Sequence, residues 1–270
     1  MAFVKNQDGE LVYYTIESFQ GTELVNHGFS TRLGGVSKGD LTSLNLGMKK
    51  NEPRKNKLDN YKIFTKSLGI NLENLVLTDQ VHKDNILEVD ESDRGKGLIK
   101  ESDIKGIDGF ITNKRNVALV TFYADCVPVF LLDPINKSIG LVHAGWKGTV
   151  SRIGEKTLKR MMQTYGTDPK DVLIAIGPSI GKCCFEVGGE VIEIIKENFE
   201  QAEEYFNKKD NGKFMLDLWN LNKDQFLEMG VLEDNITLSN ICTMCNKDIF
   251  FSHRGDHGKT GSLAAIMELK

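Results

Sequence analysis

The stretch YADCVPVFLLDPINKSIGLVHAGWKG, residues 123–148, predicts the central element of this 270-residue chain. Residues 127–132 and 138–143 are short apolar runs rich in β-formers, and the residues between them have turn chemistry. The pattern therefore predicts an antiparallel hairpin. Similar short runs occur along the rest of the chain, at residues 74–78, 86–89, 117–123, 172–176 and 250–252.

The register of the hairpin decides which side chains meet across it. If Leu132 pairs with Lys137, Cys126 lies directly opposite His143. One more residue in the loop would place these two side chains on opposite faces of the sheet. The pattern leaves this choice open.

Hydrophobic spacing of three and four residues predicts four helices around these strands. They cover residues 53–68, residues 149–165, a long amphipathic stretch from Val187 to Phe206, and a shorter stretch from an Asp217 N-cap to Met229. Several strands follow one another with no room for a helical crossover. The pattern thus favours an α/β fold with a mixed sheet and outer helices over a doubly wound parallel sheet. No linker interrupts the chain, so we predict a single domain, residues 1–270.

Charge and composition exclude several classes of partner. With 34 basic and 38 acidic residues the net charge is −4, which argues against nucleic acid held through phosphate contacts. No apolar stretch approaches the ~20 residues that span a bilayer, so no membrane partner is expected. The five cysteines are too few for a disulfide framework and the N-terminus lacks a signal-peptide pattern, which favours the cytoplasm. These features do not fix the oligomeric state.

Cys126 and His143 are the candidate reactive pair. They are either a buried thiol and a strand-end histidine with no special role, or a functional pair with one of two chemistries. A histidine lowers the pKa of a neighbouring thiol, which then attacks a carbonyl. Thiolate and imidazole also bind Zn²⁺, but a catalytic zinc ion usually takes three protein ligands. His82, in a predicted loop, is the candidate third ligand.

Several motifs in order resemble the YfiH/YlmD family, also labelled laccase-domain or multicopper polyphenol oxidase-like. The motifs are GFSTRLGGVS at 28–37, SLNLG at 43–47, QVH at 80–82, ADC at 124–126, VHAGWKGT at 142–149, IGPSIG at 176–181 and the CT…FFSHRGD…TG pattern at 242–261. The resemblance runs from end to end and is greatest to the YlmD-type purine nucleoside phosphorylases. It implies a layered α/β sandwich.

The resemblance also implies a site and an activity. It maps one Zn²⁺ onto His82, Cys126 and His143, with purine nucleosides and phosphate as substrates. The implied reactions are phosphorolysis of adenosine, inosine, guanosine and S-methyl-5′-thioadenosine, and deamination of adenosine. Copper is the alternative ion, but five histidines cannot supply the several copper sites of a laccase, so we reject that activity.

The remaining site residues are predicted less directly. The resemblance suggests Arg32 and Asn45 as substrate contacts, and Lys147 before a helix start is a further candidate for phosphate. Deamination needs a carboxylic acid to move protons, for which Asp125 is nearest in sequence. Surface charge and turn capping are the alternative interpretations of these residues.

Two functions other than a zinc enzyme are compatible with the sequence, and the four remaining cysteines form two pairs in the chain. The alternatives to a zinc enzyme are a cysteine hydrolase or deamidase that uses Cys126 with His143, and a protein that binds nucleosides without catalysis. Cys242 and Cys245 precede His253 too closely for a zinc finger, which disfavours a second zinc ion. The adjacent pair at 183–184 is expected to be buried packing.

Overall fold

Two six-stranded mixed sheets lie face to face in the computed structural model, which describes residues 2–270. The strands of the first sheet, in spatial order, are β1 (Phe3–Asp8), β2 (Leu11–Ile16), β3 (Val25–Ser30), β15 (Leu263–Leu269), β7 (Ala118–Tyr123) and β4 (Leu75–Leu77). Those of the second are β14 (Ile236–Leu238), β10 (Leu173–Ile176), β8 (Val127–Asp133), β9 (Ser138–Ala144), β6 (Gly109–Thr112) and β5 (Ile86–Glu88).

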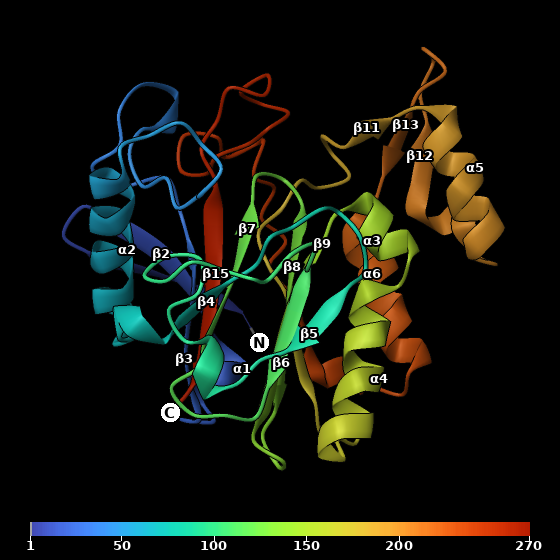
Figure 1. Ribbon diagram of the computed structural model, residues 1–270. Helices are drawn as coiled ribbons and strands as arrows, with labels where there is room; N and C mark the ends of the chain where they lie inside the picture. Colours follow the sequence, from blue (N-terminus) through green and yellow to red (C-terminus); the bar gives the residue numbers. More distant parts are fainter. Residues whose placement is uncertain (1) are drawn as a thin grey trace.

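Helices cover the outer faces of both sheets, which gives four layers (Figure 1). The longer helix α2 (Arg54–Leu68) lies on the first sheet, while α4 (Ile153–Tyr165) and α6 (Leu218–Glu228) lie on the second. The short helices are α1 (Glu17–Gln20) and α3 (Trp146–Val150). The α/β class with a mixed-sheet core and outer helices, expected from the sequence, is confirmed.

The central strands are apolar on both faces because both faces are buried. In β8, Phe130 and Leu132 pack between the sheets, whereas Val129 and Leu131 pack against the helices. Close helix packing also constrains β9: a Cβ on Gly140 would lie 3.0 Å from Thr157 of α4. The interior of the sandwich therefore holds β8 and β9 rigidly, and with them the residues at their ends.

Of the four predicted helices, two match the structure, one is divided and one is wrong. Gly69 and Gly166 terminate α2 and α4 in the left-handed conformation, and Asp217 caps α6 by accepting hydrogen bonds from two amide groups. The helix predicted over residues 149–165 is interrupted at Arg152, where φ is +59°, so that α3 and α4 are separate.

The predicted long helix from Val187 to Phe206 is wrong. Within this stretch only α5 (Gly189–Asn198) is α-helical. Val187 at the start of the stretch and Phe206 at its end belong to strands of a small third sheet. Its strands are β11 (Glu186–Val187), β13 (Phe214–Leu216) and β12 (Phe206–Lys208). Residues 250–252 are also not a strand: Phe250 and Phe251 are buried in the core from a loop. Apolar spacing alone does not distinguish a helix face from such packing. Among the described residues, no helix is long and apolar enough to cross a membrane.

Candidate active site

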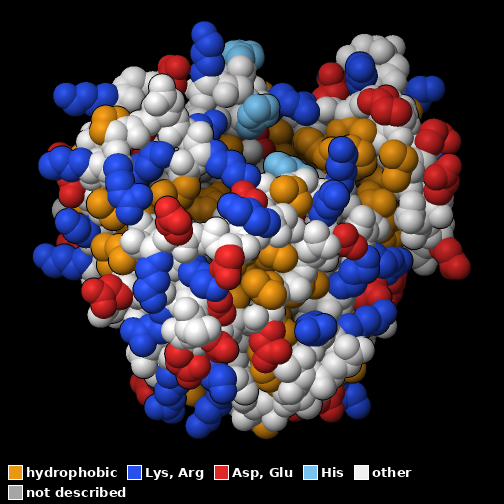
Figure 2. All heavy atoms as spheres, viewed as in Figure 1, with side chains coloured by type: hydrophobic (Ala, Val, Ile, Leu, Met, Phe, Trp, Pro, Cys, Tyr) orange, Lys and Arg blue, Asp and Glu red, His pale blue; other side chains and the backbone are white. Residues whose placement is uncertain are grey.

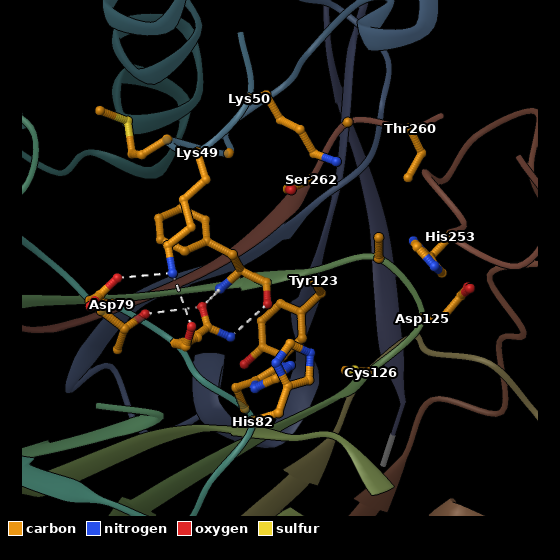
Figure 3. A pocket seen from close by; sticks show the side chains of 18 of the residues that line it. Lys49, Lys50, Asp79, His82, Tyr123, Asp125, Cys126, His253, Thr260 and Ser262 are labelled. Atoms are coloured by element: carbon orange, nitrogen blue, oxygen red, sulfur yellow. Dashed lines mark hydrogen bonds and ion pairs between the residues drawn. The ribbon is translucent and has the colours of Figure 1, made fainter. Parts of the chain in front are cut away.

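A cavity of about 680 Å³ opens where β7 and β9 end and β8 begins, beside the loops that follow β4 and precede β15. In Figure 2 it lies in the upper half of the visible face, where histidine and hydrophobic side chains border a hollow surrounded by Lys and Arg. Figure 3 shows His82, Tyr123 and Cys126 close together, with Lys49 and Asp79 to one side. The volume is in the range of small-molecule sites.

His82 reaches the cavity from an exposed loop with a fixed conformation. Its backbone is left-handed, with φ at +59°, which non-glycine residues rarely adopt outside constrained positions. Gln80 anchors the loop by bonding the backbone of Phe122, donating to its carbonyl at 2.9 Å and accepting from its amide at 2.7 Å. The loop therefore continues the pairing of β4 with β7 through the side chain of Gln80.

Asp108 holds both histidines of the site, and sequence reasoning missed it. Its fully buried carboxylate accepts backbone N–H bonds from Val81, His82 and Lys83 at 2.9–3.1 Å. The same carboxylate lies 2.9 Å from Nδ1 of His143. With Nδ1 donating to Asp108, Nε2 of His143 is free to bind a ligand. The only signal in the sequence was a carboxylate directly before an apolar strand.

Cys126 lies just before β8, and both hairpin registers considered from the sequence are wrong. The observed register pairs Asp133 with Ser138 and Pro128 with His143. Cys126 is therefore diagonal to His143 on the same face rather than directly opposite, a separation that long side chains can still bridge. The loop is four residues long, but it covers residues 134–137, so the closing pair lies one residue later in the sequence on both strands than Leu132 and Lys137.

The electrostatics of the cluster favour a thiolate beside an imidazolium when no ion is bound. Burial raises the pKa of Cys126, but the charge of His143 and hydrogen bonds from both histidines outweigh it and lower the pKa to about 6. Burial lowers the pKa of His143, but Cys126 and Asp108 raise it to about 9. Burial also opposes ionisation of Asp108, yet its hydrogen bonds keep its pKa below the usual value.

These residues fit a metal ion. The donor atoms of His82, Cys126 and His143 all lie within 4.8 Å of one another, and the two imidazole rings are 4.8 Å apart and nearly perpendicular. Two imidazoles and one thiolate form a donor set that Zn²⁺ and Cu²⁺ both accept. The carboxylate behind His143 is the outer partner that metal-binding histidines commonly have. The three predicted ligands are thus brought together.

Gly145 gives this cluster its space, which leads to the first prediction. A Cβ at this position would lie 3.1 Å from Sγ of Cys126 and 3.4 Å from the ring of His82. Its φ of −63° suits any residue, so Gly145→Ala acts by steric crowding alone. We expect about tenfold weaker metal binding, measured by competition with a chromophoric chelator, because the ligands are displaced from each other.

Gly21→Ala is the matched control for this variant. Gly21 also has a negative φ, and its added Cβ would make only ordinary contacts of 3.6 Å or more. It lies at the end of α1, and metal affinity is expected to match that of the wild type. Equal affinities for the Gly145→Ala and Gly21→Ala proteins would exclude the crowding argument.

The other predicted site residues form the supports of the cavity. Asn45 is fully buried, and its Oδ1 accepts from the amides of Gly47 and Ser262, which line the cavity. Arg32 donates to the carbonyls of Thr42 and Lys247 and is not among the lining residues.

Asp125 lines the cavity, although both of its carboxylate oxygens accept hydrogen bonds from other groups, and Lys147 is not among the lining residues. One carboxylate oxygen of Asp125 accepts from the hydroxyl of Thr243 at 2.6 Å and the other from the amide of Arg254 at 2.7 Å. Asp125 therefore ties the C-terminal loop to the site. Lys147 is exposed and its ammonium lies over the ring of Trp146, 5.6 Å from the centroid.

Comparison with known proteins gives consistent relatives. A family model described as multi-copper polyphenol oxidoreductase laccase matches residues 26–270. The purine nucleoside phosphorylase YlmD of Bacillus subtilis is 34% identical over 252 residues, covering 93% of this chain and 91% of the relative. Adenosine deaminase RL5, from an unknown prokaryotic organism, is 31% identical and covers 88% and 90%. The crystal structure of the hypothetical protein YfiH of Bacillus licheniformis has a TM-score of 0.93 at 33% identity, covering 98% of this chain and 99% of that one.

Proposed function

Because this chain belongs to the multi-copper polyphenol oxidoreductase laccase family, we propose that it is a metal-dependent enzyme of purine nucleosides. Its substrates are adenosine, inosine, guanosine and S-methyl-5′-thioadenosine, which it cleaves with phosphate, and it also deaminates adenosine. Zn²⁺ is the proposed ion, with Cu²⁺ as the alternative, and His82, Cys126 and His143 are its ligands. The relatives named as a purine nucleoside phosphorylase and an adenosine deaminase support this assignment.

One observation carries the proposal: three metal-binding side chains converge at a cavity large enough for a nucleoside. The walls are largely apolar and aromatic, with Phe122, Tyr123, Trp146 and Phe185 among the lining residues. Aromatic walls suit the flat faces of a purine base. Lys and Arg side chains surround the cavity (Figure 2), which suits an anionic co-substrate.

The two reactions place different demands on these residues. In phosphorolysis the N9–C1′ bond breaks, its electron pair and a proton go to the departing purine, and a phosphate oxygen bonds to C1′. In deamination water adds at C6 and ammonia leaves. When bound, the metal ion supplies a Lewis acid that polarises oxygen or nitrogen ligands and lowers the pKa of water. Asp108 keeps His143 oriented throughout because its carboxylate is fully buried.

Lys50 is the proposed phosphate contact and gives the second prediction. Lys49 is already paired with Asp79 at 2.9 Å, whereas Lys50 extends over the cavity beside Ser262 (Figure 3). Lys50→Ala is expected to raise the KM for phosphate about tenfold, since a charge-assisted contact is lost, with little change in the KM for inosine. Lys5→Ala, on the exposed face of β1, is the control. An unchanged phosphate KM would remove Lys50 from the phosphate site.

The proposed activity is tested with purified protein, inosine or adenosine, and phosphate. We expect hypoxanthine or adenine to form only when phosphate is present, inosine to form from adenosine, and all products to disappear after chelation and return with Zn²⁺. Release of no base and no inosine from the metal-replete protein would refute the proposal.

The cysteine hydrolase alternative is favoured by the closeness of Cys126 to His143, which lowers the pKa of the thiol to about 6 and so favours its nucleophilic form. It predicts full activity after chelation and rapid alkylation of Cys126 by iodoacetamide. A nucleoside-binding protein would show no product even in a single turnover. Direct substrate contact by Arg32 and Asn45, a single domain over residues 1–270 and a cytoplasmic location stay predictions.

A further inference from the structure

Four cysteines meet at a second place in the molecule. Cys183 and Cys184 are adjacent in the chain, and Cys242 and Cys245 lie about sixty residues further on. Their four sulfur atoms all lie within 4.8 Å of one another. Cys183 is exposed rather than buried, so the packing role expected for the first pair is wrong. His253 is not part of this group, so the cluster differs from the Cys2His2 arrangement considered from the sequence.

Two short turns joined by backbone hydrogen bonds build the cluster. In the first turn, the amides of Cys184 and Phe185 both donate to the carbonyl of Gly181 at 2.9 Å. In the second, the amide of Asn246 donates to the carbonyl of Cys242 at 3.2 Å and its side chain does so at 2.8 Å. A β-bridge between Ser179 and Cys242 holds the turns side by side. The backbone thus fixes all four cysteines independently of any sulfur bond.

The distances suit a shared ion better than a disulfide. Sγ of Cys245 lies 3.5 Å from Sγ of Cys183 and 3.4 Å from Sγ of Cys184. A disulfide bond is about 2.05 Å long. Four sulfurs bound at about 2.3 Å to a tetrahedral zinc ion are about 3.8 Å apart. The sulfur of Cys245 thus lies close to two other sulfurs at once, as it would around a common metal ion. We call these four cysteines the cage.

A backbone donor points at this cage. The amide of Gly181 lies 3.3 Å from Sγ of buried Cys242, so its N–H stabilises a thiolate there. Hydrogen bonds from backbone amides to ligand sulfurs are the usual outer partners of thiolate-bound metals. Four neutral thiols can share this space, whereas four thiolates can do so only around a cation, since like charges repel.

We propose that Cys183, Cys184, Cys242 and Cys245 bind one Zn²⁺ in a closed tetrahedral site. Four protein thiolates leave no open position, so this ion is structural and distinct from the ion at Cys126. It joins the turn before Phe185 to the turn that holds Thr243, whose hydroxyl donates to Asp125, and both Phe185 and Asp125 line one wall of the cavity. The ion therefore fixes this wall, and the inference is independent of the reaction catalysed there.

Metal analysis of three purified proteins tests the proposal. The wild type is expected to hold two zinc ions per chain, the Cys126→Ala protein one, and the Cys183→Ser, Cys245→Ser double variant one. The double variant changes the two exposed cysteines, so that no buried hydroxyl is created. Two ions in this variant, or a wild-type chain whose single ion disappears with Cys126→Ala, would overturn the proposal.

Thiol labelling of the wild-type protein tests the cage without any substitution. Exposed Cys183 and Cys245 should resist iodoacetamide while zinc is bound and become labelled after a chelator is added. Rapid labelling of the metal-replete protein would show free thiols. Labelling that requires a reductant would show a disulfide. Either result excludes the site.

Cobalt provides a spectroscopic check that separates this site from the active site. With Co²⁺ in place of zinc, the Cys126→Ala protein should show the intense visible absorption of tetrahedral cobalt tetrathiolate, and the double variant should not. If the wild-type protein is inactive on nucleosides while the Cys126→Ala protein shows this absorption, the proposed function is refuted and the cysteine site stands. If the wild-type protein is active on nucleosides while the Cys126→Ala protein lacks this absorption, the cysteine site is refuted and the proposed function stands.

Discussion

Replacement of Cys126 by alanine is expected to lower phosphorolysis of inosine more than 100-fold and to remove one metal ion per chain. The thiolate is one of three proposed ligands, and the remaining His82 and His143 cannot complete a catalytic zinc site. Loss of a partner that only orients a ligand already costs about 10–100-fold, so loss of a ligand should cost more. Initial rates with phosphate and inosine, together with elemental analysis, measure both effects.

The fold should survive this change. Cys126 is half-buried at the edge of the cavity, and alanine fits its space. Thermal unfolding and circular dichroism should therefore stay near the wild-type results. The double variant at Cys183 and Cys245 is the matched cysteine control for metal content, because it should retain the ion at the active site. An active, metal-replete Cys126→Ala protein would end the assignment of this ligand.

Replacement of Asp108 by asparagine is expected to damage both stability and metal binding. The carboxylate accepts from three backbone amides and from His143, whereas an asparagine side chain has one accepting oxygen and a donating NH₂ group. At least one buried donor is left without an acceptor, which costs about 1–3 kcal/mol. The free energy of unfolding in urea measures this loss.

The same variant should weaken metal binding about 10–100-fold, because the ring of His143 and the loop of His82 lose their common anchor. Asp59→Asn is the control, since this carboxylate lies on the outer side of α2 and pairs with Lys55. We expect wild-type metal affinity from the control. If Asp108→Asn loses stability but binds zinc as tightly as the wild type, the carboxylate supports the fold alone and does not orient the ligands.

Helices with strong local signals could be predicted from the sequence. The apolar spacing over 53–68 and the glycine after it give α2 almost to the residue, and Asp217 caps α6 as expected. These features depend on contacts within a few residues. The division at Arg152 and the replacement of a long helix by α5 and two strands depend on packing against the second sheet.

The central position of β15 shows the same limit over a longer distance. β15 is the last strand in the sequence, yet it pairs with β3 and β7 in the middle of the first sheet. An apolar run at the end of a chain predicts burial but not its partners. The hairpin formed by β8 and β9 was predicted, and only its register was wrong, because register depends on which face each sheet neighbour covers.

The three candidate metal ligands could be singled out from residue types and motifs, because imidazole and thiolate chemistry belongs to the side chains themselves. Their common anchor, Asp108, and the meeting of four cysteines could not. Both depend on segments that are distant in the chain and that meet only when the sheets pack and their loops are joined by backbone hydrogen bonds. The local sequence pattern does not predict these long-range contacts, because they depend on how whole strands are buried against each other.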